Sequence, residues 1–159
     1  MNYIQKYNSP LGKIILTSNG ENLTGLYFDG QKYFNGYGTE KNLSIFEQTK
    51  NWLDIYFCGN APNFTPPLNF QGTEFQKKVW QILLKIPFGE TKTYGEIAKM
   101  LKTSARAVGN AVAHNPISLI VPCHRVIGFN GNLTGYAGGL DKKIKLLELE
   151  NFESAKVGK

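Results

Sequence analysis

The chain has 159 residues, enough for one compact domain or two small ones. Hydrophobic residues make up 42% of it and charged residues 19%, which excludes a disordered or collagen-like chain. No apolar run approaches the roughly 20 residues that a membrane span needs, and no signal-peptide pattern is visible. The two cysteines, Cys58 and Cys123, exclude a disulfide framework and favour a reducing, cytoplasmic setting.

The net charge of +6 is unevenly distributed along the chain. Residues 1–72 carry five lysines and five acidic residues, whereas residues 73–159 carry eleven lysines and two arginines against seven acidic residues. Clustered basic residues favour a polyanionic partner, because they release counterions from a phosphate backbone. A solvated basic face explains the same charge equally well.

The first part of the chain predicts a small sheet followed by a helix. Three short β-segments, residues 2–7, 13–18 and 23–28, are separated by turn sequences and indicate an antiparallel meander. A helix is predicted to begin at a capping box, Ser44 to Glu47, and to end at Gly59. Residues 59–72 contain three prolines, so we expect one domain over residues 1–68 and a second over residues 69–159.

The second part predicts mostly helices. Capping boxes begin at Thr73 and at Thr93, and Pro87 to Gly89 interrupts the first of these helices. The second helix runs through Leu101, and a tight turn at 102–103 leads to another over residues 104–114. Two helices joined by so short a turn are a candidate helix-turn-helix.

The helix predicted over residues 104–114 has one apolar face and one flat face when its residues are placed at 100° intervals. The residues expected in the core are Ala105, Ala107, Val108, Ala111 and Val112. The opposite residues are Arg106, Gly109, Asn110 and Ala113. Such a face would let the backbone approach a partner closely, but an ordinary exposed face fits too. Further along, Asn130-Gly131 predicts the turn of a small β-hairpin, which would be the wing of a winged helix.

Cys123 is the candidate nucleophile. Residues 116–126 are expected to form an extended apolar run that places it next to His124 and Arg125. A neighbouring base or positive charge would raise its thiolate fraction, which is only a few per cent for an unperturbed thiol at pH 7. A buried, inert cysteine is the alternative for Cys123, and it is the interpretation that we adopt for Cys58.

Glu150 is the candidate third member of the site. Around the last helix it falls between Leu146 and Leu147, within the apolar arc. A carboxylate that points toward a core must be paired. His124 would be a partner of the kind found in nucleophile–base–acid arrays, but Arg125, Lys143 or a frayed helix end fits the spacing as well.

Several segments together resemble the O6-alkylguanine-DNA alkyltransferases. They are Asn115-Pro116, Pro122-Cys123-His124-Arg125-Val126, Tyr136-Ala137-Gly138-Gly139 and residues 146–150. The match runs from about Phe75 to Glu150, and the N-terminal segment agrees in length and strand pattern. The resemblance implies an α+β fold: an N-terminal small antiparallel-sheet, ribonuclease H-like domain and a C-terminal winged-helix-like helix-turn-helix domain.

The implied activity is DNA repair by direct damage reversal, in which this methyltransferase moves the alkyl group of O6-alkylguanine onto its own Cys123. Each molecule would act once, because a thioether has no easy leaving group. Whether O4-methylthymine is a second substrate is left open. The implied partner is double-stranded DNA carrying the lesion, bound through the minor groove by a cytoplasmic monomer that uses no membrane, cofactor or metal. Among possible zinc ligands, residues 1–72 offer only Cys58.

The resemblance also implies roles for individual residues. His124 would deprotonate Cys123 through a water, and Glu150 would orient His124. Tyr94 would protonate the guanine ring, and Asn115 would bridge the helix-turn-helix to the active-site strand. The groups implied to hold the base and its alkyl group are the carbonyls of Cys123 and Val126, the amide of Ala137 and the ring of Tyr136. The implied DNA contacts are Arg106, which fills the space of the flipped base, Gly109, Asn110, Ala113 and Arg125.

One departure from the family pattern is Ala137, where a serine is common. The difference should matter little for base binding if the backbone amide of this residue, and not its side chain, holds the base. Two other classes of function fit part of the pattern. Alkyltransferase-like proteins bind lesions without repairing them, but they carry another residue in place of the cysteine. A cysteine hydrolase would use the same Cys123 and His124 pair.

Overall fold

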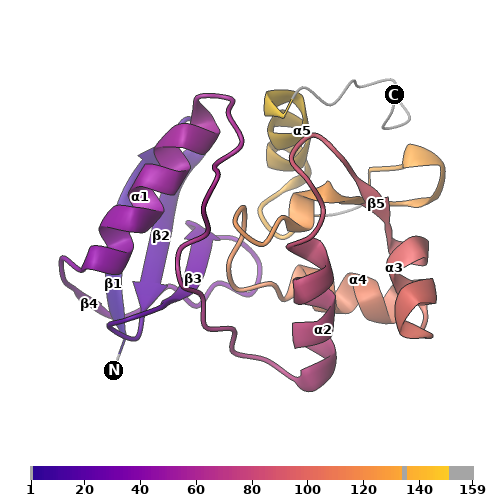
Figure 1. Cartoon of the computed structure of the whole chain (residues 1–159), viewed down its shortest axis with the longest axis horizontal. Helices are drawn as coiled ribbons and strands as arrows, with labels where there is room; N and C mark the ends of the chain where they lie inside the picture. Colours follow the sequence, from indigo (N-terminus) through magenta and orange to yellow (C-terminus); the bar gives the residue numbers. More distant parts are fainter. Residues whose placement is uncertain (1, 134–135, 151–159) are drawn as a thin grey trace. The chain divides into compact units, whose positions relative to one another are not determined.

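The computed structural model describes residues 2–133 and 136–150. The chain divides into two compact units, one of residues 1–71 with 116–118 and one of residues 72–115 with 119–159. The first unit holds a four-stranded sheet and one long helix, and the second is mostly helical (Figure 1). This is the α+β architecture that the sequence predicts.

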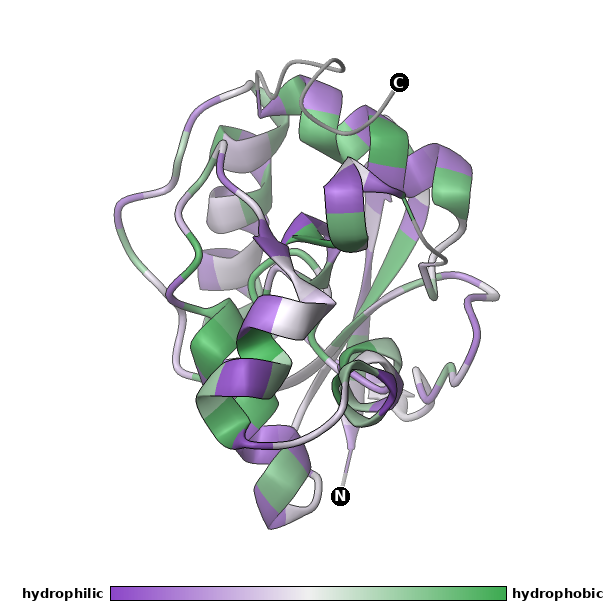
Figure 2. Cartoon of the chain, turned by 90° about the vertical axis from the view of Figure 1, so that its right-hand side faces the viewer, coloured by the Kyte–Doolittle hydropathy of each residue, from purple (hydrophilic) through white to green (hydrophobic). Residues whose placement is uncertain are grey.

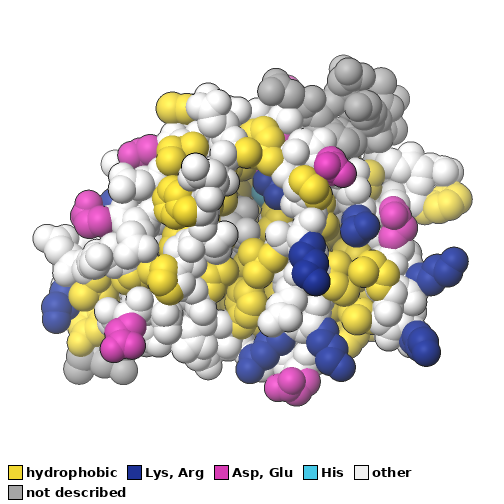
Figure 3. Space-filling model, in the orientation of Figure 1, with side chains coloured by type: hydrophobic (Ala, Val, Ile, Leu, Met, Phe, Trp, Pro, Cys, Tyr) yellow, Lys and Arg dark blue, Asp and Glu magenta, His cyan; other side chains and the backbone are white. Residues whose placement is uncertain are grey.

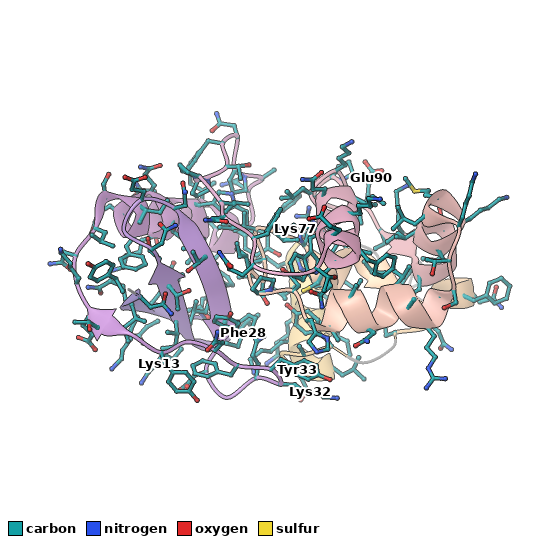
Figure 4. The ribbon with its side chains drawn as sticks, turned by 90° about the horizontal axis from the view of Figure 1, so that it is seen from below. Lys13, Phe28, Lys32, Tyr33, Lys77 and Glu90 are labelled. Carbon is teal, nitrogen blue, oxygen red and sulfur yellow. The ribbon has the colours of Figure 1, made fainter. Side chains whose placement is uncertain are left out.

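The sheet of the first unit is built on a meander. Strands β1 (Tyr3–Ser9), β2 (Gly12–Ser18) and β3 (Leu23–Phe28) pair antiparallel in chain order, which confirms the prediction. Figure 4 labels Lys13 and Phe28 at one end of the β2–β3 pair, where the Asp29 amide donates to the Lys13 carbonyl at 3.0 Å. A short strand that the sequence pattern did not reveal, β4 (Thr39–Glu40), pairs parallel with β1. The sheet is therefore mixed and not purely antiparallel.

Helix α1 (Ser44–Phe57) contacts strands β1, β2 and β3 of this sheet. The predicted capping box is wrong, because Leu43 is the N-cap and the hydroxyl of Ser44 lies inside the first turn, where it cannot reach the N3 amide. Cys58 follows the helix and is exposed, so the expectation that it is buried is also wrong. Pro116 to Ser118 join the first unit through two backbone hydrogen bonds to Leu26, at 2.8 and 3.0 Å.

The first three helices of the second unit begin where the sequence predicts, and a fourth, the last helix, follows. They are α2 (Glu74–Leu83), α3 (Tyr94–Leu101), α4 (Ala105–Ala113) and α5 (Leu140–Leu149). Both predicted capping boxes, at Thr73 and Thr93, are confirmed. Lys102, in the left-handed conformation (φ 54°), ends α3, and the Ser104 side chain caps α4, so the helix-turn-helix pair is confirmed.

Packing in the second unit follows the hydrophobic faces of its helices, which Figure 2 distinguishes from their hydrophilic faces. The Trp80 indole donates to the Ala111 carbonyl at 2.9 Å and so ties α2 to α4. Val108, Ala111 and Val112 are buried as expected, whereas Ala105 is exposed, because it lies in the first turn of α4, just after the cap. Within the described residues, no helix is both long and apolar enough to cross a bilayer.

Two local expectations around the cysteine are corrected. The run from Pro116 to Pro122 is not extended: Ile117 forms an isolated bridge with Leu26, and residues 118–121 form turns and a bend, with buried Leu119 in the left-handed region (φ 71°). Cys123–Arg125 form a 3-10 helix, η1. Where a β-hairpin was expected, Phe129–Gly131 form a second 3-10 turn, η2, closed by a Gly128 amide to Asn132 carbonyl bond of 2.6 Å. The second unit's short sheet instead pairs β5 (Lys92–Thr93) parallel with β6 (Val126–Ile127).

Candidate active site

Cys123 lies at the start of η1 with 3% of its surface exposed. Its amide donates to the Val121 carbonyl at 2.8 Å. The same carbonyl accepts the side-chain amide of Asn115 at 2.8 Å, and Asn115 is itself buried just past the end of α4. The end of the helix-turn-helix is thus hydrogen-bonded to the turn that holds the cysteine.

His124 and Glu150 form a buried pair. The Nε2 atom of His124 lies 2.6 Å from Oε2 of Glu150, and neither side chain is exposed. The carboxylate sits at the end of α5 and points inward, as its position around the helix predicts. An ionised carboxylate can only accept, so Nε2 carries the hydrogen and Nδ1 is the acceptor nitrogen of the imidazole. This is the tautomer that a general base needs.

The surroundings of the pair keep the histidine neutral and the acid ionised. Burial lowers the pKa of His124, and the hydrogen bond and charge of Glu150 offset this only in part. Burial opposes ionisation of Glu150, but the hydrogen bonds that it accepts from His124 and Arg125, together with the charge of Arg125, hold the pKa of this carboxyl well below its usual range. At neutral pH the imidazole is therefore able to take up a proton.

The side chain of Arg125 is buried and hydrogen-bonded inside the second unit. Its Nε and Nη2 atoms donate to the two carboxylate oxygens of Glu150, at 2.8 and 3.1 Å, and Nη1 donates to the Ile86 carbonyl at 2.7 Å. The guanidinium also lies 5.8 Å from the centre of the Phe88 ring, and only 7% of the residue is exposed. The expected DNA contact by Arg125 does not fit this placement. The guanidinium instead binds both carboxylate oxygens of Glu150.

The loop between α2 and β5 completes the carboxylate's surroundings, and sequence reasoning missed it. The Gly89 amide donates to Oε1 of Glu150 at 3.1 Å. Gly89 has φ 84°, and an added Cβ would lie 3.2 Å from the Glu150 carbonyl oxygen, so a side chain here would be strained and crowded. The sequence shows this glycine only as a helix breaker.

Lys143 on α5 is the second residue that sequence reasoning did not place in the site. Its side chain is fully buried, and Nζ donates to the Val126 carbonyl at 2.7 Å. Nζ also lies 5.8 Å from the centre of the Tyr94 ring. Burial lowers the pKa of Lys143 to about 8. The available signal was its position on the helix, because Lys143 falls between Leu146 and Leu147 within the same apolar arc as Glu150.

The β5–β6 pair brings Tyr94 toward the cysteine segment. Thr93 pairs with Ile127, and Tyr94, the next residue, opens α3. The Tyr94 ring also faces α4, where an added Cβ on Gly109 would be in ordinary contact with it at 3.9 Å. Tyr136 and Ala137 are half-buried in the segment before α5, and the Tyr136 carbonyl accepts the Gly139 amide at 2.8 Å.

The other expected DNA contacts lie on α4. Arg106 and Asn110 are exposed, while Gly109 and Ala113 are half-buried. Figure 3 shows Lys and Arg side chains spread over the surface of the second unit, which carries the whole net charge of the chain. No group of three or more His, Cys, Asp or Glu side chains within residues 2–133 and 136–150 is arranged to hold a metal ion.

Comparison with known proteins finds a matching family model for each of the two units. A family model described as 6-O-methylguanine DNA methyltransferase, DNA binding domain, matches residues 74–152, and its ribonuclease-like domain matches residues 2–70. The methylated-DNA–protein-cysteine methyltransferase of Mycobacterium leprae is 46% identical over 156 residues, covering 96% of this chain and 94% of its own. The protein of that name from Methanosarcina acetivorans is 47% identical, covering 93% and 97%.

Solved structures agree with these matches. Mycobacterium tuberculosis OGT in complex with DNA has a TM-score of 0.86 and 41% identity, covering 99% of both chains. An O6-methylguanine DNA methyltransferase from Methanococcus jannaschii has a TM-score of 0.66 and 34% identity, covering 94% of this chain and 93% of its own. Matches to both units, at this identity and over nearly the full length, leave one assignment: the chain belongs to the O6-methylguanine-DNA methyltransferase family.

Proposed function

We propose that this chain repairs DNA by transferring the alkyl group of O6-alkylguanine to its own Cys123. The observation that carries the proposal is the buried hydrogen bond of 2.6 Å between Glu150 and His124, the residue that directly follows Cys123. The pair supplies a neutral imidazole held in the tautomer that accepts a proton. The relatives named methylated-DNA–protein-cysteine methyltransferases support the same chemistry.

The reaction needs an ionised sulfur and a leaving group that departs neutral. His124 takes the thiol proton through a water, and the thiolate attacks the alkyl carbon, so that a carbon–sulfur bond forms as the bond to O6 breaks. Tyr94 donates a proton to the guanine, which leaves more easily as a neutral base than as an anion. The product is a thioether with no easy leaving group, so each molecule reacts once.

The burial of Cys123 requires that the substrate base leave the double helix. A thiol that is 3% exposed cannot reach an atom inside a stacked duplex, so the lesion must rotate out of it. Arg106 projects from the first turn of α4 and fills the space that the base leaves. The exposed guanine edge is then held by the carbonyls of Cys123 and Val126 and the amide of Ala137, with Tyr136 beside the alkyl group.

Helix α4 binds the minor groove. Its small residues, Gly109, Asn110 and Ala113, let the helix backbone approach a narrow groove closely. Binding then depends on phosphate contacts from the basic second unit and is independent of base sequence, which suits damage that occurs anywhere. The protein acts as a monomer on double-stranded DNA.

Incubation with DNA that carries a labelled O6-methylguanine tests the proposal. We expect label to move to the protein up to one methyl group per molecule, and Cys123→Ala to abolish the transfer. Cys58→Ala, which removes an exposed cysteine, is the matched control and should transfer normally. Binding without transfer would indicate an alkyltransferase-like protein, and sustained turnover of an ester or amide would indicate a hydrolase.

A further inference from the structure

Lys143 carries a buried charge whose close partners, among the residues that the structure describes, are neutral groups. Its side chain is fully buried, and its close partners are the Val126 carbonyl and the face of the Tyr94 ring. Within the described part of the chain, no carboxylate lies within ion-pair distance of Nζ. A buried ammonium without an anion is costly, and carbonyl and ring contacts offset that cost only in part.

The Glu150 carboxylate does not balance the charge of Lys143, because Arg125 already neutralises it. Glu150 accepts two hydrogen bonds from Arg125 and one from His124. Burial keeps His124 neutral, so one negative charge is matched by the one positive charge of Arg125. The buried group of Cys123, His124, Arg125, Lys143 and Glu150 therefore carries one excess positive charge as long as the sulfur is protonated.

Ionisation of Cys123 removes that excess. Helix α5 contacts the η1 turn that begins with Cys123, and the Val126 carbonyl that accepts from Nζ comes directly after that turn, so the ammonium is held against the cysteine segment. A negative charge on the sulfur raises the pKa of this ammonium, against the larger opposing effect of burial. A nearby cation in turn favours the thiolate. The two groups thus stabilise each other's charged form, and the group as a whole becomes neutral.

We propose that Lys143 is the counter-ion of the Cys123 thiolate, and that it holds the sulfur ready for transfer. The inference deepens the proposed function and rests on it. In the full reaction the thiol proton ends on the guanine, the sulfur gains the alkyl carbon, and the guanine oxygen keeps the electron pair of the broken bond. Because the thioether is neutral, transfer leaves Lys143 without its anion.

A direct titration of the thiol tests the inference without DNA, so its outcome is independent of the proposed function. The thiolate is followed by its ultraviolet absorbance, as the difference between each protein and its Cys123→Ser counterpart. Lys143→Met removes the charge at similar volume, and we expect it to raise the pKa of the Cys123 thiol by about 1 or more. Lys145→Met, on the exposed side of the same helix, is the control and should leave this pKa unchanged.

The pH dependence of transfer separates this role from mere support of the fold. Lys143→Met should slow transfer about tenfold at pH 7 and approach the wild-type rate as the pH is raised, because each unit of pKa is a tenfold change in thiolate. An equal reduction at every pH, with an unchanged thiol pKa, would overturn the inference.

A second measurement does not depend on that variant folding. The pKa of Lys143 can be followed by nuclear magnetic resonance of labelled lysine in the wild type and in Cys123→Ser, which replaces one atom and removes the anion. We expect the pKa of Lys143 to be lower in Cys123→Ser and in the S-methylated protein than in the wild type. Identical values in all three proteins would contradict a counter-ion role.

Discussion

The carboxylate of Glu150 is shared between His124, whose Nε2 lies 2.6 Å from Oε2, and Arg125, whose Nε lies 2.8 Å from Oε1. The two partners are adjacent in the chain, on the 3-10 turn that begins with Cys123. The end of α5 is therefore fixed to the nucleophile's own turn. The same carboxylate accepts a hydrogen bond from the imidazole and neutralises the arginine.

Glu150→Gln should slow transfer while leaving DNA affinity nearly unchanged, because Glu150 is buried and acts on His124. General-base catalysis is worth about 10² to 10⁴ in rate, so we expect a loss of at least about 100-fold. We also expect a loss of about 3 kcal/mol in the free energy of unfolding, since Arg125 becomes an uncompensated buried charge. Single-turnover transfer, DNA binding and denaturant unfolding measure the three effects.

Glu148→Gln is the matched control for this change, because Glu148 lies on the same helix and is exposed. It should alter none of the three quantities. Parallel losses of DNA affinity and transfer rate in Glu150→Gln would reduce Glu150 to a structural residue.

The contribution of Glu150 to stability should disappear in acid. Its pKa is lower in the folded state than the roughly 4.3 of an unfolded glutamate, so the unfolded chain binds more protons between these values. The stabilisation is present above about pH 4.3 and is lost as the pH falls through the folded-state pKa. Urea unfolding of the wild type and Glu150→Gln from pH 7 to 3 should give a difference that shrinks with acid; a constant difference would argue against an ionised, paired carboxylate.

The buried charge of Lys143 should lower the stability of the fold at neutral pH, and this cost should disappear at alkaline pH. Its pKa is about 8 in the fold and roughly 10.4 when unfolded, so its burial is most costly below pH 8. Because the unfolded chain binds more protons between these values, the stability of the wild type relative to Lys143→Met should rise with pH, by about 3 kcal/mol in all. Unfolding curves at pH 7 and 10.5 measure the change, and a relative stability that falls with pH would mean that the lysine is stabilised by its surroundings.

Arg106→Ala should slow repair of duplex DNA more than reaction with free O6-benzylguanine. The free base needs no extrusion from a helix, so a residue that fills the vacated stack has no role in its reaction. Lys99→Ala, which removes an exposed positive charge from α3, controls for electrostatics. Equal rate losses on the two substrates would exclude Arg106 from base extrusion.

Gly109→Ala should separate stability from DNA binding. Alanine is favoured over glycine inside a helix by about 1 kcal/mol, and the added Cβ would meet the Tyr94 ring at an ordinary distance of 3.9 Å. The melting temperature should therefore rise by a few degrees. If α4 enters the minor groove, the same methyl group should weaken DNA binding severalfold; unchanged affinity would show that Gly109 lies away from the DNA.

Local signals in the sequence predicted much of the fold, and contacts between distant segments account for most of what it did not. The capping boxes at Thr73 and Thr93 were predicted correctly because a cap is satisfied within one turn of helix. The box at Ser44 failed because the helix starts after Leu43, a one-residue shift that no local rule detects. The two-residue strands and the turns around Leu119 depend on pairing with distant segments.

The same distinction holds in the site. The helical position of Glu150 predicted that it points inward, and its pairing with His124 was one of several alternatives. Arg125 was another of these alternatives, and its bonds to Glu150 and to the Ile86 carbonyl span 25 and 39 residues, so no local pattern indicates them. The position of Lys143 within the apolar arc of the last helix is evident from the sequence. It does not by itself indicate a buried ammonium, because the long stem of a lysine in such a position normally lets the charge reach water.

The mass of the intact protein after exposure to DNA containing O6-methylguanine shows whether Cys123 takes the alkyl group. We expect every active molecule to gain the mass of one methylene group, peptide mapping to place it on Cys123, and Cys58 to be unmodified. A protein that binds the damaged DNA but keeps its original mass, or that gains the group on Cys58, would contradict the proposed transfer to Cys123.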